Sequence, residues 1–162
     1  MRSKLKQLNR ALLDAAVTGG LAKVRLLLEQ GADVNAADSE HQETPLILAV
    51  KSADPAMVRL LLNAGANIDA RDNHGRTALF YACFPSEISR VLLETGADIR
   101  TRDAEGSTVL LYKVWQSPSV SELEELLRLG IDLDISNEAG ETARSVAENL
   151  GLVNIVQRLR RN

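Results

Sequence analysis

Aromatic residues and cysteine are scarce in this chain of 162 residues. Aromatic side chains make up 3% of the sequence, while apolar residues make up 45%. The core must therefore be built from Leu, Val, Ile and Ala, which suits closely stacked helices with small residues between them. Cys83 is the one cysteine, so no intramolecular disulfide can form and nothing demands an oxidising compartment.

The chain also lacks a basic surplus and a long apolar run. Its net charge is -3 and its pI is near 5.5. Because phosphate binding needs a basic stripe, nucleic acid is not expected as the main partner. No stretch approaches the roughly 18 apolar residues of a membrane-spanning helix, and the charged N-terminus has no apolar signal core. We therefore expect a monomeric, cytoplasmic protein with no membrane partner.

Catalytic and cofactor-binding motifs are missing too. The sequence contains no phosphate-binding GxxxxGK[ST] loop, no GxGxxG and no HExxH. Both histidines, His41 and His74, fall in predicted turns. Cys83 occupies a position where other parts of the chain place Val or Ala, so we expect a small core residue rather than a nucleophile. The sequence predicts a protein that is not an enzyme and has no cofactor or metal.

Glycine and threonine, by contrast, recur at regular distances. The glycines that close apolar helical stretches follow steps of 34, 31 and 34 residues: Gly31, Gly65, Gly96 and Gly130. The threonines that open the next stretches follow steps of 33, 31 and 34 residues: Thr44, Thr77, Thr108 and Thr142. A period of about 33 residues indicates a solenoid, in which each unit buries its apolar face against its neighbours.

Two short motifs recur in register around these markers. The segments GADVNAAD (31–38), GANIDARD (65–72) and GADIRTRD (96–103) are followed by ETPLILA (43–49), RTALFYA (76–82) and STVLLYK (107–113). These motifs resemble those of ankyrin repeats, over roughly residues 5 to 160. The resemblance implies an all-α solenoid of helix-turn-helix units joined by β-hairpin-like loops.

One feature of that family is absent. The usual His of its Thr-Pro-Leu-His motif is replaced at every copy, by Ile47, Phe80, Leu111 and Ser145. We expect apolar packing to replace most of the hydrogen bonds that this His makes in the family.

The repeats divide the chain into five units within one domain, 1–162. Their approximate boundaries are 5–37, 38–71, 72–102, 103–136 and 137–162. The first and last units are predicted to be caps, because a terminal unit needs one face in water. In the clearest unit, Thr44 should cap the first helix with Pro45 at its first position, and Asp54 should start the second helix.

Three spacings depart from the period. One extra residue between Asp38 and Thr44 predicts a bulged hairpin. About two residues are missing around Phe84 and Pro85, so one helix of that unit must be shortened. An extra residue within 116–119 predicts a longer turn in the next unit.

The resemblance also implies a concave surface, lined by hairpins and first helices, that binds protein partners. Three rows would lie on it: the residue before each helix-opening Thr, the residue three before it, and the far end of each first helix. From these rows we predict the partner-binding residues Glu43, Lys51, His74, Arg76, Phe84, Glu105, Ser107, Trp115 and Gln116.

Two interpretations fit Trp115. As the only Trp, it could be an interface hot spot, or it could cover the core at the irregular turn that follows it. On the second helix of the same unit, Glu122, Glu124 and Glu125 are expected on a solvated outer face.

His41 and His74 both lie three residues before the Thr of consecutive units. Stacking should place them side by side, at roughly the 8–10 Å separation of packed helices, where two imidazoles could approach one metal ion. A zinc site needs about four ligands, and the row continues with Glu105 and then Ala139. Two solvated turn histidines are therefore the favoured interpretation.

We predict a non-catalytic module that binds a protein partner through its concave face. One alternative is a regulatory inhibitor or immunity-type protein, which would occlude a single enzyme or toxin and abolish its activity. A metal-dependent sensor is a further alternative, which would bind zinc and depend on His41 or His74.

Overall fold

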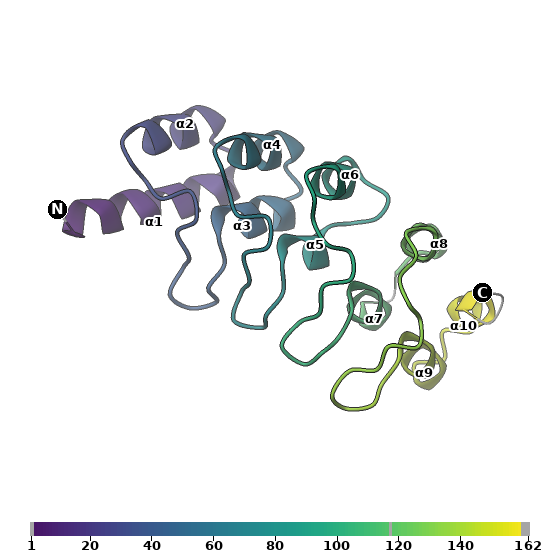
Figure 1. Cartoon of the computed structure of the whole chain (residues 1–162). Helices are drawn as coiled ribbons and strands as arrows, with labels where there is room; N and C mark the ends of the chain where they lie inside the picture. Colours follow the sequence, from purple (N-terminus) through teal and green to yellow (C-terminus); the bar gives the residue numbers. More distant parts are fainter. Residues whose placement is uncertain (1, 117, 160–162) are drawn as a thin grey trace.

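The structure, a computed structural model, describes residues 2–116 and 118–159. Its helices are paired in two layers, and the loops between pairs project from the helices on one side (Figure 1). The first helices of the pairs, each packed against the next, are α1 (Arg2–Thr18), α3 (Pro45–Lys51), α5 (Ala78–Tyr81), α7 (Val109–Trp115) and α9 (Ala143–Asn149). The second helices are α2 (Leu21–Glu29), α4 (Pro55–Asn63), α6 (Glu87–Glu94), α8 (Val120–Arg128) and α10 (Val153–Leu159).

The predicted all-α solenoid is confirmed. Because each pair packs mainly on its neighbours, the chain advances from one end of the stack to the other, with α1 and α10 at opposite ends (Figure 1). We keep the division into five repeats, with the boundaries given above, as a proposal. Ser117 and residues 160–162 of that division lie outside the described residues.

Side-chain caps start α3 and α4 where the sequence predicts them. Thr44 accepts a hydrogen bond from the backbone N–H of Ile47, and Pro45 occupies the first position of α3. Asp54 caps α4 in the same way. The chain leaves α4 through Gly65, whose φ of 88° lies in the left-handed region that favours glycine.

Backbone hydrogen bonds join the loops between successive pairs, which we call fingers (32–43, 66–76, 97–107 and 131–141). The bonds run from Asn73 N to His41 O (2.8 Å), from Ala104 N to His74 O (2.8 Å) and from Glu138 N to Glu105 O (2.9 Å). Within the described ranges the fingers form no strand, and one isolated β-bridge links Arg102 and Thr108. The chain of each finger therefore follows the path of a hairpin, but apart from that bridge its described residues form no ladder of strand hydrogen bonds.

The finger 32–43 is one residue longer than the next and bulges as predicted. The Asp38 carboxylate holds the bulge by accepting the backbone N–H groups of Glu40, His41 and Glu43 at 2.8, 2.7 and 2.7 Å. Gln42 takes a φ of 58°, the conformation that a glycine supplies in the other fingers.

Two arginine side chains join neighbouring fingers through hydrogen bonds. Arg71 donates to the carbonyls of Gly75 and Arg102, and Arg102 in turn donates to the carbonyls of Gly106 and Ser136. Each guanidinium thus ties its own finger to the following one, because it offers several donors in a fixed planar arrangement.

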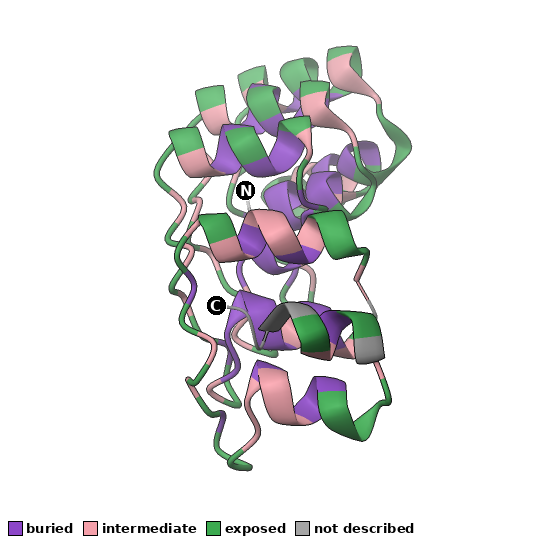
Figure 2. Cartoon of the chain, turned by 90° about the vertical axis from the view of Figure 1, so that its right-hand side faces the viewer, coloured by how far each residue is buried: buried purple, intermediate pink, exposed green. Residues whose placement is uncertain are grey.

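The core lies between the two layers, and the outward faces of the helices are exposed (Figure 2). Apolar packing takes the place of the family His, as predicted, at Ile47, Phe80 and Leu111, which are fully buried. In the last unit Ser145 instead forms a capping box with Thr142.

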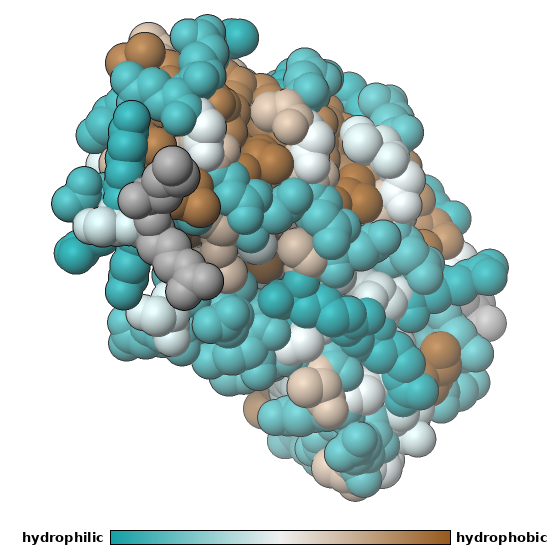
Figure 3. All heavy atoms as spheres, turned by 60° about the vertical axis from the view of Figure 1, so that its left-hand side comes forward, coloured by the Kyte–Doolittle hydropathy of each residue, from teal (hydrophilic) through white to brown (hydrophobic). Residues whose placement is uncertain are grey.

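The N-terminal end of the stack has a mixed surface. α1 is the longest helix among the described residues, with 17 residues, and with α2 it exposes Leu5, Val17 and Leu26. Seen from this side, hydrophobic patches break through between hydrophilic side chains over the helices (Figure 3). In the part of the chain that the structure describes, no helix has the length and apolar character needed to cross a bilayer.

The third pair contains the predicted short helix. α5 has four residues, whereas α3 and α7 have seven each. The prediction that Cys83 is a core residue is wrong, because it is exposed and the neighbouring Phe84 is buried instead. With its last turn missing, α5 ends before Cys83, and the extended chain that follows turns this side chain outward.

The predicted solvated face of α8 is wrong at one position. Glu122 pairs with Lys113 at 3.5 Å and also accepts the backbone N–H of Phe84 at 3.2 Å, so its side chain is 16% exposed. Glu124 and Glu125 both approach Arg128, at 3.9 and 3.2 Å. Glu122 thus fills space that the short α5 leaves beside α7, which helical spacing within α8 does not reveal.

Candidate protein-binding surface

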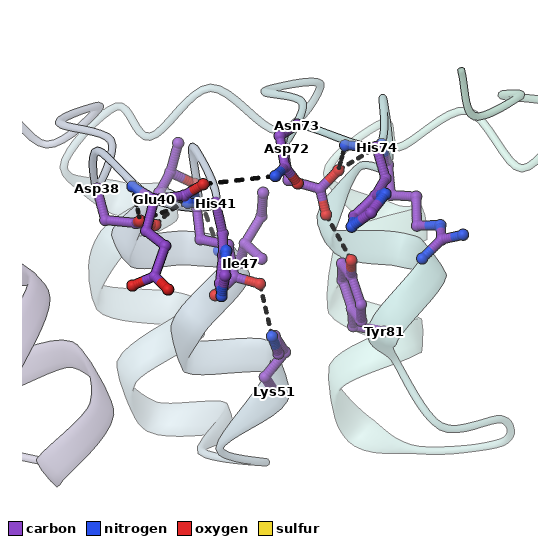
Figure 4. Close-up of polar contacts among 12 residues, drawn as sticks. Asp38, Glu40, His41, Ile47, Lys51, Asp72, Asn73, His74 and Tyr81 are labelled. Atoms are coloured by element: carbon purple, nitrogen blue, oxygen red, sulfur yellow. Dashed lines mark hydrogen bonds and ion pairs between the residues drawn. The ribbon is translucent and has the colours of Figure 1, made fainter. Parts of the chain in front are cut away.

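Side chains of the first helices point toward the finger of their own unit, as Lys51 and Tyr81 do (Figure 4). In the second unit, Glu43 of the finger accepts from Lys51 of α3 at 2.5 Å. In the third unit, the Tyr81 hydroxyl of α5 donates to Asp72 of the finger. We call this surface, made by the fingers and first helices, the inner face.

Two tyrosines and two cations form a ladder across the inner face. The rings of Tyr81 and Tyr112 meet edge to face with centroids 6.1 Å apart. The Lys51 ammonium lies 5.1 Å from the Tyr81 centroid, and the Arg76 guanidinium lies 4.4 Å from the Tyr112 centroid. These four residues, called the aromatic ladder below, run over three successive units and join them by ring and cation–π contacts.

Buried carboxylates hold both cations in place. Glu43 and Asp103, with side chains 8% and 1% exposed, pair with Lys51 and Arg76, whose side chains are 41% and 17% exposed. Burial by itself would lower the pKa of Arg76, but its contacts with Tyr81 and Asp103 outweigh burial and raise the pKa. The cations are therefore fixed from the core side, with part of each side chain left in solvent.

The Tyr81 hydroxyl is also held in one state. Its partial burial, followed by its hydrogen bond to Asp72, raises the pKa of Tyr81 well above its usual range. Asp72 accepts the backbone N–H groups of His74 and Arg76 as well, at 2.8 and 2.9 Å. The hydroxyl therefore stays protonated at neutral pH and acts as a structural donor that joins helix and finger.

Comparison with known protein families identifies these units. The family model described as ankyrin repeats, in three copies, matches residues 12–103, which is more than half of the chain. The chain belongs to the ankyrin repeat family. Ankyrin repeats generally serve as non-catalytic protein–protein interaction modules. No curated protein matches the chain.

The nine partner-binding residues predicted for this ankyrin domain divide by exposure. Lys51, His74, Glu105 and Gln116 are exposed, and Arg76 and Trp115 are partly buried. Of these, Lys51 and Arg76 belong to the aromatic ladder, while His74 and Glu105 lie at finger tips that a backbone bond connects. These six residues remain predicted partner contacts.

The other three predicted contacts, Glu43, Phe84 and Ser107, are buried. Glu43 is covered because it pairs with Lys51, and Phe84 is drawn into the core because α5 ends early. Ser107 is fully buried, and its hydroxyl has no hydrogen-bond partner among the described residues. These side chains support the inner face from beneath and offer little surface to a partner, so their prediction as contacts is corrected.

Trp115 ends α7 and packs its ring against the core while keeping part of its surface in solvent. It therefore covers the core, as one of the two interpretations requires. Its partial exposure leaves the other interpretation open as a prediction.

The two histidines lie in consecutive fingers, connected through the bond from Asn73 N to His41 O, and both are exposed (Figure 4). Within residues 2–116 and 118–159, no group of three or more His, Cys, Asp and Glu side chains is placed to bind a metal ion. His41 and His74 thus lie in neighbouring turns, with no group of further metal-ligating side chains beside them in the described part of the chain.

The two tyrosines of the aromatic ladder are the site residues that sequence reasoning missed. Tyr81 and Tyr112 both stand four residues after a helix-opening Thr, in a row that begins with Leu48. This row lies between two of the rows chosen from the sequence, and its recurrence at the repeat period was the available signal.

Proposed function

We propose that this ankyrin domain binds a protein partner, without catalysis, through its inner face. The partner would contact the aromatic ladder and the finger tips around His74 and Glu105. Gln116 and the exposed part of Trp115 would extend the contact at the far end of α7.

The ladder is the observation that supports this proposal. Tyrosine, tryptophan and arginine dominate protein interfaces, and here their positions are set before binding by ring contacts and buried carboxylates. A surface that is already ordered loses little conformational entropy when it binds, so more of the contact energy contributes to affinity.

We also propose that the domain is not an enzyme. The groups whose pKa departs from the usual range, Asp38, Arg76 and Tyr81, each take part in hydrogen bonds or ion pairs that hold fingers and helices together. None of the three pairs with a nucleophile in the described part of the chain, whereas an active site would need that pairing.

The test begins with affinity capture from the native cell and quantitative mass spectrometry, which identify the partner. The purified partner is then titrated against wild type and against a triple variant of exposed inner-face residues, His74→Ala, Glu105→Lys and Gln116→Glu. A matched control variant, Arg90→Glu with Glu94→Lys, changes exposed residues on the outer side of α6. Circular dichroism verifies that all the variants fold.

We expect the inner-face variant to weaken binding by at least about tenfold and the control to change it little. Trp115→Ala, measured alongside, is expected to weaken binding as well. Binding that survives in the inner-face variant but is lost in the α6 control would refute the proposal. If the partner is an enzyme, an activity assay on the complex distinguishes an inhibitor from a plain interaction module.

A further inference from the structure

The short helix α5 leaves a gap in the stack. α5 ends at Tyr81, and the chain then places Phe84 in the core and Cys83 at the surface before α6 begins at Glu87. A helix of the length of α3 or α7 would fill the space next to both neighbouring units. Side chains close one side of this gap, and the other side stays open as a cavity.

The side toward α7 and α8 is closed. Glu122 of α8 reaches over to accept the backbone N–H of Phe84 at 3.2 Å, and Lys113 of α7 pairs with the same oxygen at 3.5 Å. Their side chains are 16% and 9% exposed, so a hydrogen-bonded ion pair occupies this side of the gap.

The side toward α3 and α4 stays open as a cavity of about 210 Å³. Its lining is mostly apolar and comes from Val50, Ala53, Pro55, Cys83, Ser86, Glu87 and Ile88. Pockets for small molecules usually measure about 300–1,000 Å³, so this cavity suits one large side chain better than a metabolite. The one charged residue of the lining, Glu87, is already paired with Arg59 at 3.0 Å.

One cation lies at the same boundary between units as the cavity. Lys51 directly follows Val50, which lines the cavity, and its ammonium lies over the ring of Tyr81, so Lys51 bridges the second and third units, whose residues form the lining. Glu43, which lies on the core side, accepts one N–H group of the Lys51 ammonium. The Lys51 side chain is 41% exposed. An ammonium has three donors, so it can also receive an acidic group from solvent.

We propose that this cavity anchors one large apolar side chain, of the size of Leu, Met or Phe, from the protein partner. An acidic residue next to it in the partner would pair with Lys51. This inference rests on the proposed function and deepens it, since it states which chemistry the partner presents. Hot spots are often single side chains that fill a pocket while surrounding contacts exclude water.

The test uses three capped dipeptides as probes: N-acetyl-phenylalanyl-aspartyl amide, N-acetyl-phenylalanyl-lysyl amide and N-acetyl-seryl-aspartyl amide. Methyl NMR follows Val50 and Ile88, which line the cavity, and the rate at which a thiol reagent modifies Cys83 gives a second reading. We expect the phenylalanyl-aspartyl probe to shift both methyl signals and slow thiol modification, with a Kd of about millimolar. The seryl probe should do neither.

Three variants make the result specific. Cys83→Phe should fill the cavity from its rim and weaken the best probe by about tenfold or more, while Arg90→Glu, on the outer side of α6 and outside the cavity lining, leaves probe binding unchanged. In Lys51→Gln the aspartyl probe should lose about two- to fivefold, down to the affinity of the lysyl probe. Circular dichroism checks that each variant folds. The rate of Cys83 modification is measured on the wild-type protein, so that result does not depend on the folding of any variant.

The anchor proposal is overturned if the methyl signals of Val50 and Ile88 do not move at about 10 mM probe, or if the seryl probe acts equally. Titration with the captured partner separates this failure from that of the proposed function. Full partner binding by Cys83→Phe, together with loss in the inner-face variant, would refute the anchor and leave the function standing. Full binding by the inner-face variant refutes the function, whatever the probes do.

Discussion

Tyr81 makes one contact with its own finger and one with each of the two neighbouring units. Its hydroxyl donates to Asp72 in the finger, its ring meets Tyr112 of the next unit, and Lys51 of the previous unit lies over its face. Asp72 is buried, so it depends on donors supplied by the protein. The hydroxyl therefore matters more for stability than its half-buried position suggests.

Tyr81→Phe is expected to lower the free energy of unfolding at pH 7 by about 1 kcal/mol, because Asp72 loses a donor that water replaces only in part. Urea unfolding followed by circular dichroism measures the change. Tyr112→Phe is the control and should have little effect, because no hydrogen bond involves its hydroxyl within the described ranges.

The same hydroxyl predicts how stability depends on alkaline pH. Its pKa is raised above 10.0 in the folded state, so between pH 10 and the folded pKa the folded protein keeps a proton that the unfolded chain has lost. The stabilisation is complete below about pH 10 and decreases as pH rises further. Urea midpoints should therefore fall less steeply above pH 10 in Tyr81→Phe than in wild type. Equal slopes would contradict this assignment.

At the scale of single elements, the finger 32–43 depends on one carboxylate. Burial alone would raise the pKa of Asp38, but the backbone N–H groups of His41, Glu40 and Glu43, together with the positive charge of His41, lower it overall. Since the folded pKa is below that of the unfolded chain, this stabilisation is present above about pH 4 and is lost as the pH falls through the folded pKa.

Asp38→Ala should open this finger without unfolding the stack. The amides of Glu40, His41 and Glu43 are expected to exchange with solvent about tenfold faster or more, since each loses a hydrogen-bond acceptor. Hydrogen exchange read by NMR measures this at each amide. Ser39→Ala, in the same finger, is the control, and exchange that is equal in both variants would refute the role of Asp38.

The short α5 predicts opposite outcomes at two adjacent residues. Phe84 is buried and Cys83 is exposed, so Phe84→Ala should cost about 3–5 kcal/mol of unfolding free energy, and Cys83→Ser less than about 0.5 kcal/mol. Chemical denaturation of both variants measures the difference. A large loss in Cys83→Ser with a small one in Phe84→Ala would mean that the chain continues as a helix past Tyr81.

On the scale of the whole molecule, the spacing between units limits which side chains the fingers can carry. Gly75 and Gly140 occupy the same place in their fingers and have nearly equal φ values, 72° and 78°. A Cβ at Gly75 would lie 2.6 Å from the backbone nitrogen of Ala104, which donates to His74, whereas a Cβ at Gly140 meets nothing within 4 Å. The difference between the two positions isolates the contact between neighbouring units.

Gly140→Ala should cost about 1–2 kcal/mol, from left-handed backbone strain alone. Gly75→Ala carries the same strain and must also push the next finger away, which adds about 1–3 kcal/mol. Urea unfolding of the two variants gives the difference directly. Equal losses would show that the fingers can separate at this point at no cost.

The sequence by itself determined the repeat, the helix caps, the apolar positions of the core and the place of each irregularity. These features are local: the cap at Thr44 depends on residues within one turn, and a solenoid unit needs only a face that matches its neighbour. Replacement of the family His by buried Ile47, Phe80 and Leu111 also followed from residue type alone. Six of the nine predicted contact residues keep some exposure for the same reason, since their rows follow from the period.

Only the tertiary structure decided what happens where the period breaks and which charges meet. Cys83 and Phe84 exchange the positions expected from the pattern because the missing turn of α5 changes the direction of the chain. Glu122 moves inward because a gap opens beside another unit, and the aromatic ladder forms because Tyr81 and Tyr112 meet across units. Such contacts join residues about 30–40 positions apart, so no spacing within one repeat specifies them.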